Sequence, residues 1–143
     1  MKLTGRCLCE AISYEIEGPL GPIFNCHCSK CRRWHGAAFR TRASIKKSQF
    51  KWVTGEHLLS KFHSSDNVVK TFCSVCGSNL MSFYENDPDL VGVPLGGLEQ
   101  DPESMPVANI FAGSKAPWYQ LTDGLPQHQE WPLSESNVRE TKP

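Results

Sequence analysis

The sequence predicts a single, mostly-β domain of short antiparallel strands with one or two short helices. Three observations lead to this prediction. The chain has 143 residues, a length that suits one domain, so that residues 1–143 form one unit. Short apolar segments recur along it with turn signals between them, which is typical of all-β domains. Its seven cysteines are grouped at positions far apart, as in small domains whose distant segments share a metal ion.

The first expected strand has the clearest pattern. Ile12, Tyr14 and Ile16 alternate with polar residues, which is the period of a half-buried strand. Gly18 and Pro19 then end it. Seven further strands are expected, at residues 38–43, 50–53, 58–63, 68–72, 78–84, 90–93 and 108–112.

Two segments have helical signals. Residues 29–36 are expected to form one helix, with Ser29 as the N-cap and Gly36 as the stop. Residues 102–105 are expected to form a short turn of helix before Pro106. Residues 133–143 are expected to be a solvated C-terminal tail.

The environment of the chain decides how its cysteines are interpreted. No apolar run approaches the roughly 20 residues that span a bilayer, and residues 1–10 contain no apolar segment that could serve as a signal peptide. We therefore expect a cytoplasmic protein without a membrane partner. A reducing compartment disfavours disulfides, and seven thiols cannot all pair, so metal binding is the favoured explanation.

Four of the cysteines form two short pairs. Cys7 and Cys9 are two residues apart, so both thiols can point the same way from the end of a strand. Cys73 and Cys76 form a Cys-x-x-Cys knuckle, and Gly77 after it can take a positive φ. Together they supply the four thiolates of a structural zinc, so Cys9→Ala is expected to give insoluble or zinc-depleted protein.

The other three cysteines, Cys26, Cys28 and Cys31, lie in one short loop that runs into the predicted helix. Three protein ligands leave a fourth position for water or substrate, the arrangement of catalytic zinc. A closed site completed by a histidine is the alternative, and His35 suits that role better than His27, which is expected to point away from the ion. A redox role without metal is a third possibility. Two zinc ions are thus expected, one structural and one catalytic.

The charge distribution bears on the partners. Residues 1–83 carry 12 Lys and Arg against five Asp and Glu, whereas residues 84–143 carry three against ten. The basic residues between positions 30 and 51 form either a solvated face or an anion-binding rim beside the three cysteines. A sequence pI near 6.9 and the lack of a basic tail make nucleic acid an unlikely partner.

Three motifs resemble those of the glutathione-dependent formaldehyde-activating enzyme (centromere protein V) family. They are Gly5-Arg6-Cys7-Leu8-Cys9, then Cys26-His27-Cys28-Ser29-Lys30-Cys31-Arg32, then Phe72-Cys73-Ser74-Val75-Cys76-Gly77. The stretch from Ala116 to Trp118, with the later Asp123 to Pro126 and Trp131-Pro132, also resembles the family's C-terminal part.

The resemblance implies a zinc-stapled β-tent-type domain, with a structural zinc on Cys7, Cys9, Cys73 and Cys76 and a catalytic zinc on Cys26, Cys28 and Cys31. It also implies a carbon–sulfur lyase-type activity that forms S-hydroxymethylglutathione from glutathione and formaldehyde.

For the open site, we expect a soft fourth ligand, a substrate thiol that adds to a small aldehyde. Arg32, Arg33 or Arg40 could pair with carboxylates of a thiol such as glutathione, and Trp34 and Phe39 could wall the pocket. His27, His35, His57 and His63 are all candidate general bases, and the sequence does not choose among them.

Two other classes of function stay open at this level. The first is a zinc-stapled binding module for nucleic acid or protein, without catalysis. The second is a sensor in which Cys26, Cys28 or Cys31 is oxidised and releases zinc. Neither the oligomeric state nor the identity of the thiol and aldehyde can be read from the sequence.

Overall fold

The computed structural model describes residues 1–132 of the chain. Its strands are β1 (Lys2–Arg6), β2 (Ser13–Glu17), β3 (Phe24–Cys26), β4 (Arg40–Lys46), β5 (Phe50–Thr54), β6 (Leu59–His63), β7 (Val68–Cys73), β8 (Asn79–Tyr84), β9 (Leu90–Pro94) and β10 (Ala108–Ile110). The helices are α1 (Ser29–His35) and the short 3-10 helices η1 (Lys47–Gln49), η2 (Glu56–Leu58), η3 (Leu95–Gly97) and η4 (Ala112–Ser114). The predicted mostly-β fold is confirmed.

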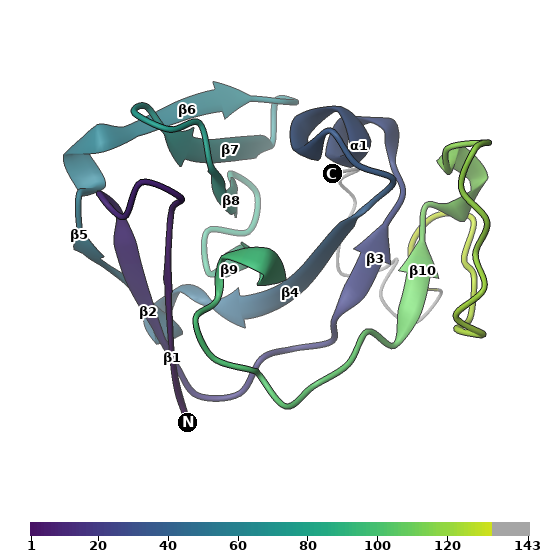
Figure 1. Cartoon of the computed structure of the whole chain (residues 1–143), viewed down its shortest axis with the longest axis horizontal. Coiled ribbons are helices and arrows are strands. Elements are labelled where there is room, and N and C mark those ends of the chain that lie inside the picture. The colour runs from purple at the N-terminus through teal and green to yellow at the C-terminus, as the bar shows by residue number, and fades with distance from the viewer. Residues whose placement is uncertain (133–143) are drawn as a thin grey trace.

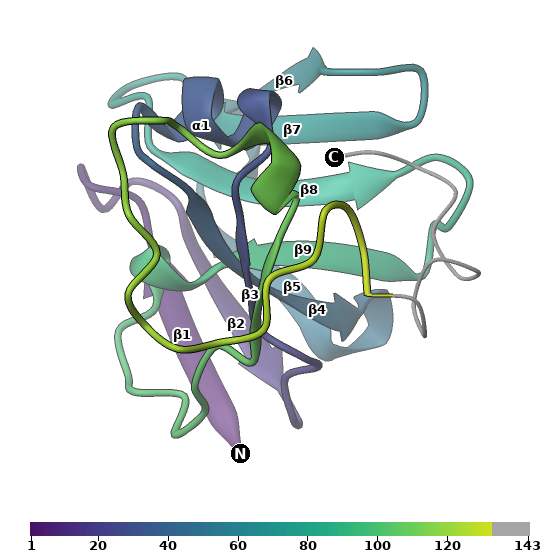
Figure 2. The same ribbon diagram turned by 90° about the vertical axis from the view of Figure 1, so that its right-hand side faces the viewer.

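The strands form two sheets. The smaller sheet has the order β1-β2-β5, and the larger one has the order β10-β3-β4-β9-β8-β7-β6. Figure 1 shows the small sheet at the left, β3 and β10 at the right, and α1 above the start of β4. Figure 2 views the molecule from the side on which β10 lies, and it shows β6, β7, β8 and β9 one below another. All pairs within the named strands are antiparallel except β10 with β3, which is parallel.

The principal core lies between the two sheets. The alternation predicted for β2 is observed, because Ile12, Tyr14 and Ile16 are all buried. They pack in one apolar cluster with residues of the large sheet, among them Ile45, Leu80, Met81 and Val91. Burying one such aliphatic side chain contributes about 1.5–3 kcal/mol to the stability of the folded state. This cluster therefore stabilises the packing of the two sheets against each other.

Helix α1 lies close to its predicted position, but its first cap differs. Cys28, not Ser29, is the N-cap, and its side chain accepts a hydrogen bond from the backbone N–H of Cys31. Gly36 ends the helix in the left-handed conformation, with φ of 59°, as the stop signal predicts. A candidate metal ligand therefore occupies the capping position.

One other local prediction needs correction, and two strands were not predicted. Residues 102–105 form no helix, and the chain there shows only a bend at Glu103, which has a positive φ. Strand β1 was not predicted because it has one large apolar residue, and β3 because it has only three residues. The predicted tail at 133–143 lies outside the described residues. Within residues 1–132, no helix has the length and apolar character needed to cross a bilayer.

Candidate metal centres

The first centre gathers the thiols of Cys7, Cys9, Cys73 and Cys76, which all lie within 4.8 Å of one another. The Sγ atoms of Cys7 and Cys9 are 3.6 Å apart, and those of Cys9 and Cys73 are 3.8 Å apart. A tetrahedral zinc with Zn–S bonds of about 2.3 Å places its sulfurs roughly 3.8 Å apart. The two measured separations match that spacing, so the four thiols could hold one zinc ion.

Hydrogen bonds to sulfur orient these thiols. The backbone N–H of Ile12 donates to Cys7 Sγ over 3.3 Å, and that of Val75 donates to Cys73 Sγ over 3.4 Å. Ser78 joins the two cysteine turns, because its hydroxyl accepts from the Leu8 N–H at 2.8 Å and lies 3.2 Å from Cys76 Sγ. The hydrogen bond with the Ser78 side chain is the largest of the effects that lower the pKa of Cys76 to about 5. A lowered pKa favours the thiolate form, which is the form that binds a metal.

Gly77 completes the Cys-x-x-Cys turn. Its φ is 75°, and its N–H donates to the carbonyl of Cys73 over 2.8 Å, which closes the knuckle. A side chain would meet no atom within 4 Å there, so the glycine is needed for the backbone conformation and not for space.

The second centre gathers the thiols of Cys26, Cys28 and Cys31, again within 4.8 Å of one another. Cys26 is the last residue of β3, Cys28 caps α1, and Cys31 lies in the first turn of that helix. All three are buried, in a second apolar cluster with Phe24, Ile110 and others. The strand end and the helix start therefore position three sulfurs around one point.

The charge at this centre is concentrated on one sulfur. Hydrogen bonds from Cys26 and from Cys28, followed by the charges of Arg40 and Lys70, lower the pKa of Cys31 to about 2. The pKa of Cys26 is raised well above its usual value, chiefly because it donates to Cys28 and Cys31. A buried thiolate that two neighbouring thiols and two cations stabilise is a suitable donor set for a soft cation such as zinc.

His35 does not complete this group, because its ring nitrogens fall outside the set of mutually close ligand atoms in the described residues. Its Nδ1 lies 3.3 Å from Asn79 Nδ2, which also donates to the carbonyl of Trp34. An amide nitrogen is a donor, so we assign Nδ1 as the acceptor and place the proton on Nε2. That buried Nε2 has no hydrogen-bond partner in residues 1–132.

Burial, and then the charge of Arg40, lower the pKa of His35 from 6.5 to about 4, so the folded state binds fewer protons than the unfolded chain between those values. The stability of the wild type should therefore fall as the pH drops from about 6.5 to about 4. His35→Gln should lose less stability over the same interval, as judged from urea unfolding midpoints at the two ends of it. An equal loss in both proteins would show that His35 does not titrate as described.

His27 lies between two candidate ligands but points away from them, as expected. Its Nε2 lies 2.8 Å from Oδ1 of Asn109 in β10, and Asn109 Nδ2 donates to both oxygens of Asp123 at 3.1 Å. Its backbone N–H donates to the carbonyl of Ile110. His27 therefore ties the cysteine loop to β10 and to the segment around Asp123.

The basic residues predicted near the site fall into two groups. Arg33 is exposed, and Arg32 is half-buried with its Nε donating to the carbonyl of His27. Arg40 is buried, donates to Ser82 Oγ and to the carbonyl of Gly92, and lies 5.0 Å from the ring centroid of Trp34. Arg40 and Trp34 are thus packed together, whereas Arg32 and Arg33 lie nearer the surface.

A cavity of about 600 Å³ lies beside these residues. Its lining includes Cys7 of the first centre, and His35, Phe39 and Arg40 next to the second. Both His35 and Arg40 are close enough to Cys31 for its charge to act on their pKa values. Neither Arg32, Arg33 nor Trp34 lines this cavity.

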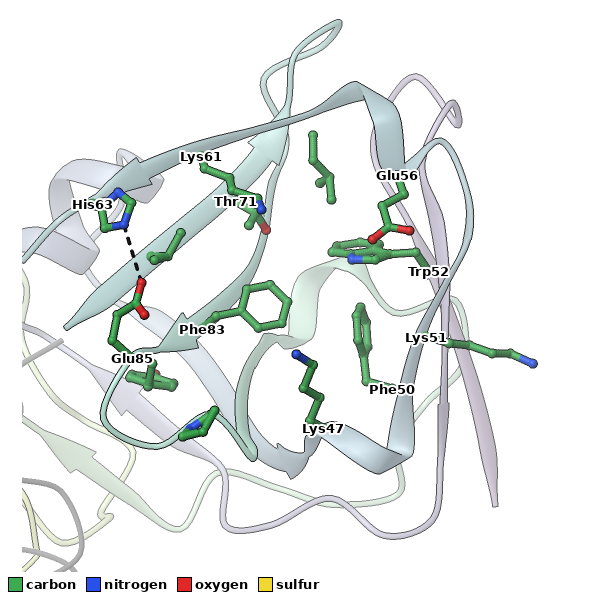
Figure 3. A pocket seen from close by; sticks show the side chains of 14 residues that line it. Lys47, Phe50, Lys51, Trp52, Glu56, Lys61, His63, Thr71, Phe83 and Glu85 are labelled. Atoms are coloured by element: carbon green, nitrogen blue, oxygen red, sulfur yellow. Dashed lines mark ion pairs between the residues drawn. The ribbon is translucent and has the colours of Figure 1, made fainter. Parts of the chain in front are cut away.

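A separate cavity of about 840 Å³ lies between β5 and the strands β6 to β8. Figure 3 shows the aromatic rings of Phe50, Trp52 and Phe83 around it, with the amino group of Lys47 pointing inward and that of Lys51 pointing away. None of the seven cysteines lines it. It is therefore not the place where the thiols could act.

Sequence reasoning missed Lys70, Asn79 and Asn109. Lys70 carried only a weak signal, as a lysine in an expected strand that also contains Val68, Val69 and Phe72. Asn79 and Asn109 are 44 and 82 residues from the histidines that they contact, so only the folded chain reveals them.

Comparisons with known proteins bear on the fold and on the family of the chain. A crystal structure of a Rhodobacter sphaeroides protein superimposes with a TM-score of 0.59 and 25% sequence identity, over 72% of this chain and 97% of that one. No curated protein matches the chain significantly. The model of the family described as glutathione-dependent formaldehyde-activating enzyme matches residues 2–114, a span that includes all seven cysteines. The chain therefore belongs to the glutathione-dependent formaldehyde-activating enzyme family.

Proposed function

We propose that this protein is a zinc-dependent carbon–sulfur lyase-type enzyme that adds a thiol, glutathione or a similar one, to a small aldehyde such as formaldehyde. Membership of the family supports a glutathione-dependent formaldehyde-activating or related function. Cys7, Cys9, Cys73 and Cys76 would hold a structural zinc, and Cys26, Cys28 and Cys31 a catalytic one.

The observation that carries the proposal is the difference between the two centres. The first offers four thiols, whereas the second offers three and gains no fourth His, Cys, Asp or Glu from the described residues. A closed tetrahedral site is structural, and a site with three protein ligands keeps a position for substrate. A zinc ion held by Cys26, Cys28 and Cys31 would favour the thiolate form of a bound thiol.

The protein's own residues would bind and orient the reactants. The cavity of about 600 Å³ has the size of a small-ligand site, and its wall includes His35 and Arg40, which lie beside the three-cysteine centre, but none of the three thiols. The His35 ring is neutral at pH 7, because its pKa is lowered to about 4. Its Nε2–H, which has no hydrogen-bond partner within residues 1–132, could donate to an aldehyde oxygen. Such a donor stabilises the negative charge that develops on that oxygen.

The proposed reaction is balanced without an oxidant or a reductant. The thiol sulfur forms a bond to the aldehyde carbon, and the carbonyl π bond breaks. The proton lost by the thiol is replaced by one on the new hydroxyl oxygen, so the product is a hemithioacetal.

The test is the rate at which glutathione and ¹³C-labelled formaldehyde interconvert with their adduct, measured by NMR exchange spectroscopy. The reaction without protein gives the background rate. We expect the zinc-loaded protein to accelerate both directions. A rate equal to the background, from protein shown to contain two zinc ions, would contradict the proposed function.

A further inference from the structure

Two buried cations flank one aromatic ring beside the three-cysteine centre. Lys70 and Arg40 are 2% and 3% exposed. The Lys70 Nζ lies 4.3 Å from the ring centroid of Trp34, and the Arg40 Cζ lies 5.0 Å from it. Trp34 is in α1, one turn after Cys31, so the same short helix carries both the thiol and the ring.

Neither cation has a carboxylate partner among residues 1–132. The ion pairs found in residues 1–132 involve Lys2, Lys51, Arg6 and His63, all at the surface, and not Lys70 or Arg40. The Lys70 Nζ and the Arg40 Nε are buried and have no hydrogen-bond partner there. A buried unpaired charge is costly, and a cation–π contact of about 2 kcal/mol offsets only part of that cost.

The sulfurs of the three-cysteine centre are the anions that act on both cations. Burial lowers the pKa of Arg40 and lowers that of Lys70 to about 8, so both remain cations at neutral pH. The charges of Cys31 and Cys26 oppose that shift at both residues, and the charge of Cys28 also does so at Lys70. The strand register explains part of this arrangement, because Arg40 in β4 is the direct partner of Cys26 in β3. Residues directly opposite each other on antiparallel strands extend to the same face of the sheet.

The charge count then predicts what the centre prefers as a fourth ligand. Three thiolates and one divalent zinc carry −1 together, and Lys70 and Arg40, the cations on which these sulfurs act, bring the group to +1. Arg42, which is also buried and acts on Arg40, adds to the positive side. A neutral fourth ligand leaves that positive charge as it is, whereas an anionic one reduces it. We infer that Lys70 and Arg40 are specificity-determining residues that make the three-cysteine centre select an anionic fourth ligand, a thiolate in the proposed reaction, over a neutral one.

This inference rests on the proposed function for the open position, but it concerns the charge of the ligand and not the turnover of a substrate. The test uses the protein with cobalt(II) in place of zinc. The visible bands and the sulfur-to-cobalt charge-transfer bands of cobalt(II) change when an added ligand enters the coordination sphere. The closed four-cysteine centre gives a constant background. The probes are azide and glutathione as anionic ligands, and imidazole as the neutral one.

In the wild type we expect azide and glutathione to bind. Lys70→Met should lower the affinities for azide and for glutathione by about tenfold to hundredfold, because one nearby charge affects an ionised group by that much. It should leave the affinity for imidazole unchanged. Lys70→Arg should restore the anion affinity. Lys30→Met, which removes an exposed lysine from the same helix α1, should behave as the wild type. If Lys70→Met fails to take up two metal ions, Arg40→Gln serves as the charge-removing variant.

Three outcomes would overturn the inference. An equal loss for azide and imidazole would mean a general structural role, and no loss for either would mean that the cations do not act on the ligand. A wild-type spectrum that no probe changes would overturn it together with the open site. If azide and imidazole bind but glutathione does not, the proposed function fails. The inference is then decided by whether Lys70→Met lowers the azide affinity more than the imidazole affinity.

Discussion

Cys9→Ala is expected to leave the chain without its native fold, although Cys9 itself is exposed. The Sγ atoms of Cys9 and Cys73 are 3.8 Å apart across 64 residues of sequence, so one ion at this centre would join the turn after β1 to the end of β7. Structural zinc sites of this kind contribute about 10–16 kcal/mol, which matches or exceeds the 5–15 kcal/mol total stability of a typical domain.

The exposed position of Cys9 makes the experiment clean. Alanine there removes a ligand but leaves no cavity in the core, so any loss of stability must come through the metal. The measurements are the zinc content per chain and the thermal unfolding transition. Leu8→Ala is the matched control, because Leu8 is the adjacent residue and is 83% exposed. A Cys9→Ala protein with two zinc ions and an unchanged transition would rule out the four-cysteine site.

Cys31→Ser is expected to abolish the proposed activity while most of the fold survives. Cys31 is fully buried and carries the thiolate of the second centre, with a pKa lowered to about 2 first by hydrogen bonds from Cys26 and Cys28. A serine hydroxyl is not ionised at neutral pH and is a poor zinc ligand. Zinc should drop from two ions per chain to one, and the adduct exchange rate should fall to the background.

The same variant separates the two centres. The four-cysteine centre keeps its ligands in Cys31→Ser, so we expect a cooperative unfolding transition with a modest decrease in midpoint. Lys30→Ala changes the preceding, exposed residue of α1 and should keep both zinc ions and the full rate. A Cys31→Ser protein with undiminished rate would place the chemistry elsewhere.

Local pattern was sufficient for much of the fold and for the grouping of the cysteines. The spacing within each Cys-x-Cys and Cys-x-x-Cys pair, with the odd total, divides the seven thiols into four and three, and the structure places them in those two clusters. The alternation of buried residues in β2 and the end of α1 at Gly36 could also be predicted, because each depends on residues that are close in sequence.

What the sequence did not reveal depends on residues that meet only in the folded chain. The parallel pairing of β10 with β3 joins segments about 80 residues apart. Lys70 resembles any strand lysine until β7 is placed beside α1, where its amino group lies over the Trp34 ring and the charges of the thiols act on it. Likewise, the sequence offered Arg40 as one of three arginines that could pair with carboxylates of the thiol, and it did not reveal that Arg40 is buried in register opposite Cys26.

The most direct measurement is zinc X-ray absorption fine structure on the purified protein, alone and with excess glutathione, with total zinc determined on the same sample. One closed and one open centre predict two zinc ions that average about 3.5 sulfur ligands each at roughly 2.3 Å, with a light atom at the open position. Glutathione should raise that average toward four. A nitrogen scatterer that persists, with no change on adding glutathione, would show that a histidine closes the second centre and would contradict the proposed catalysis.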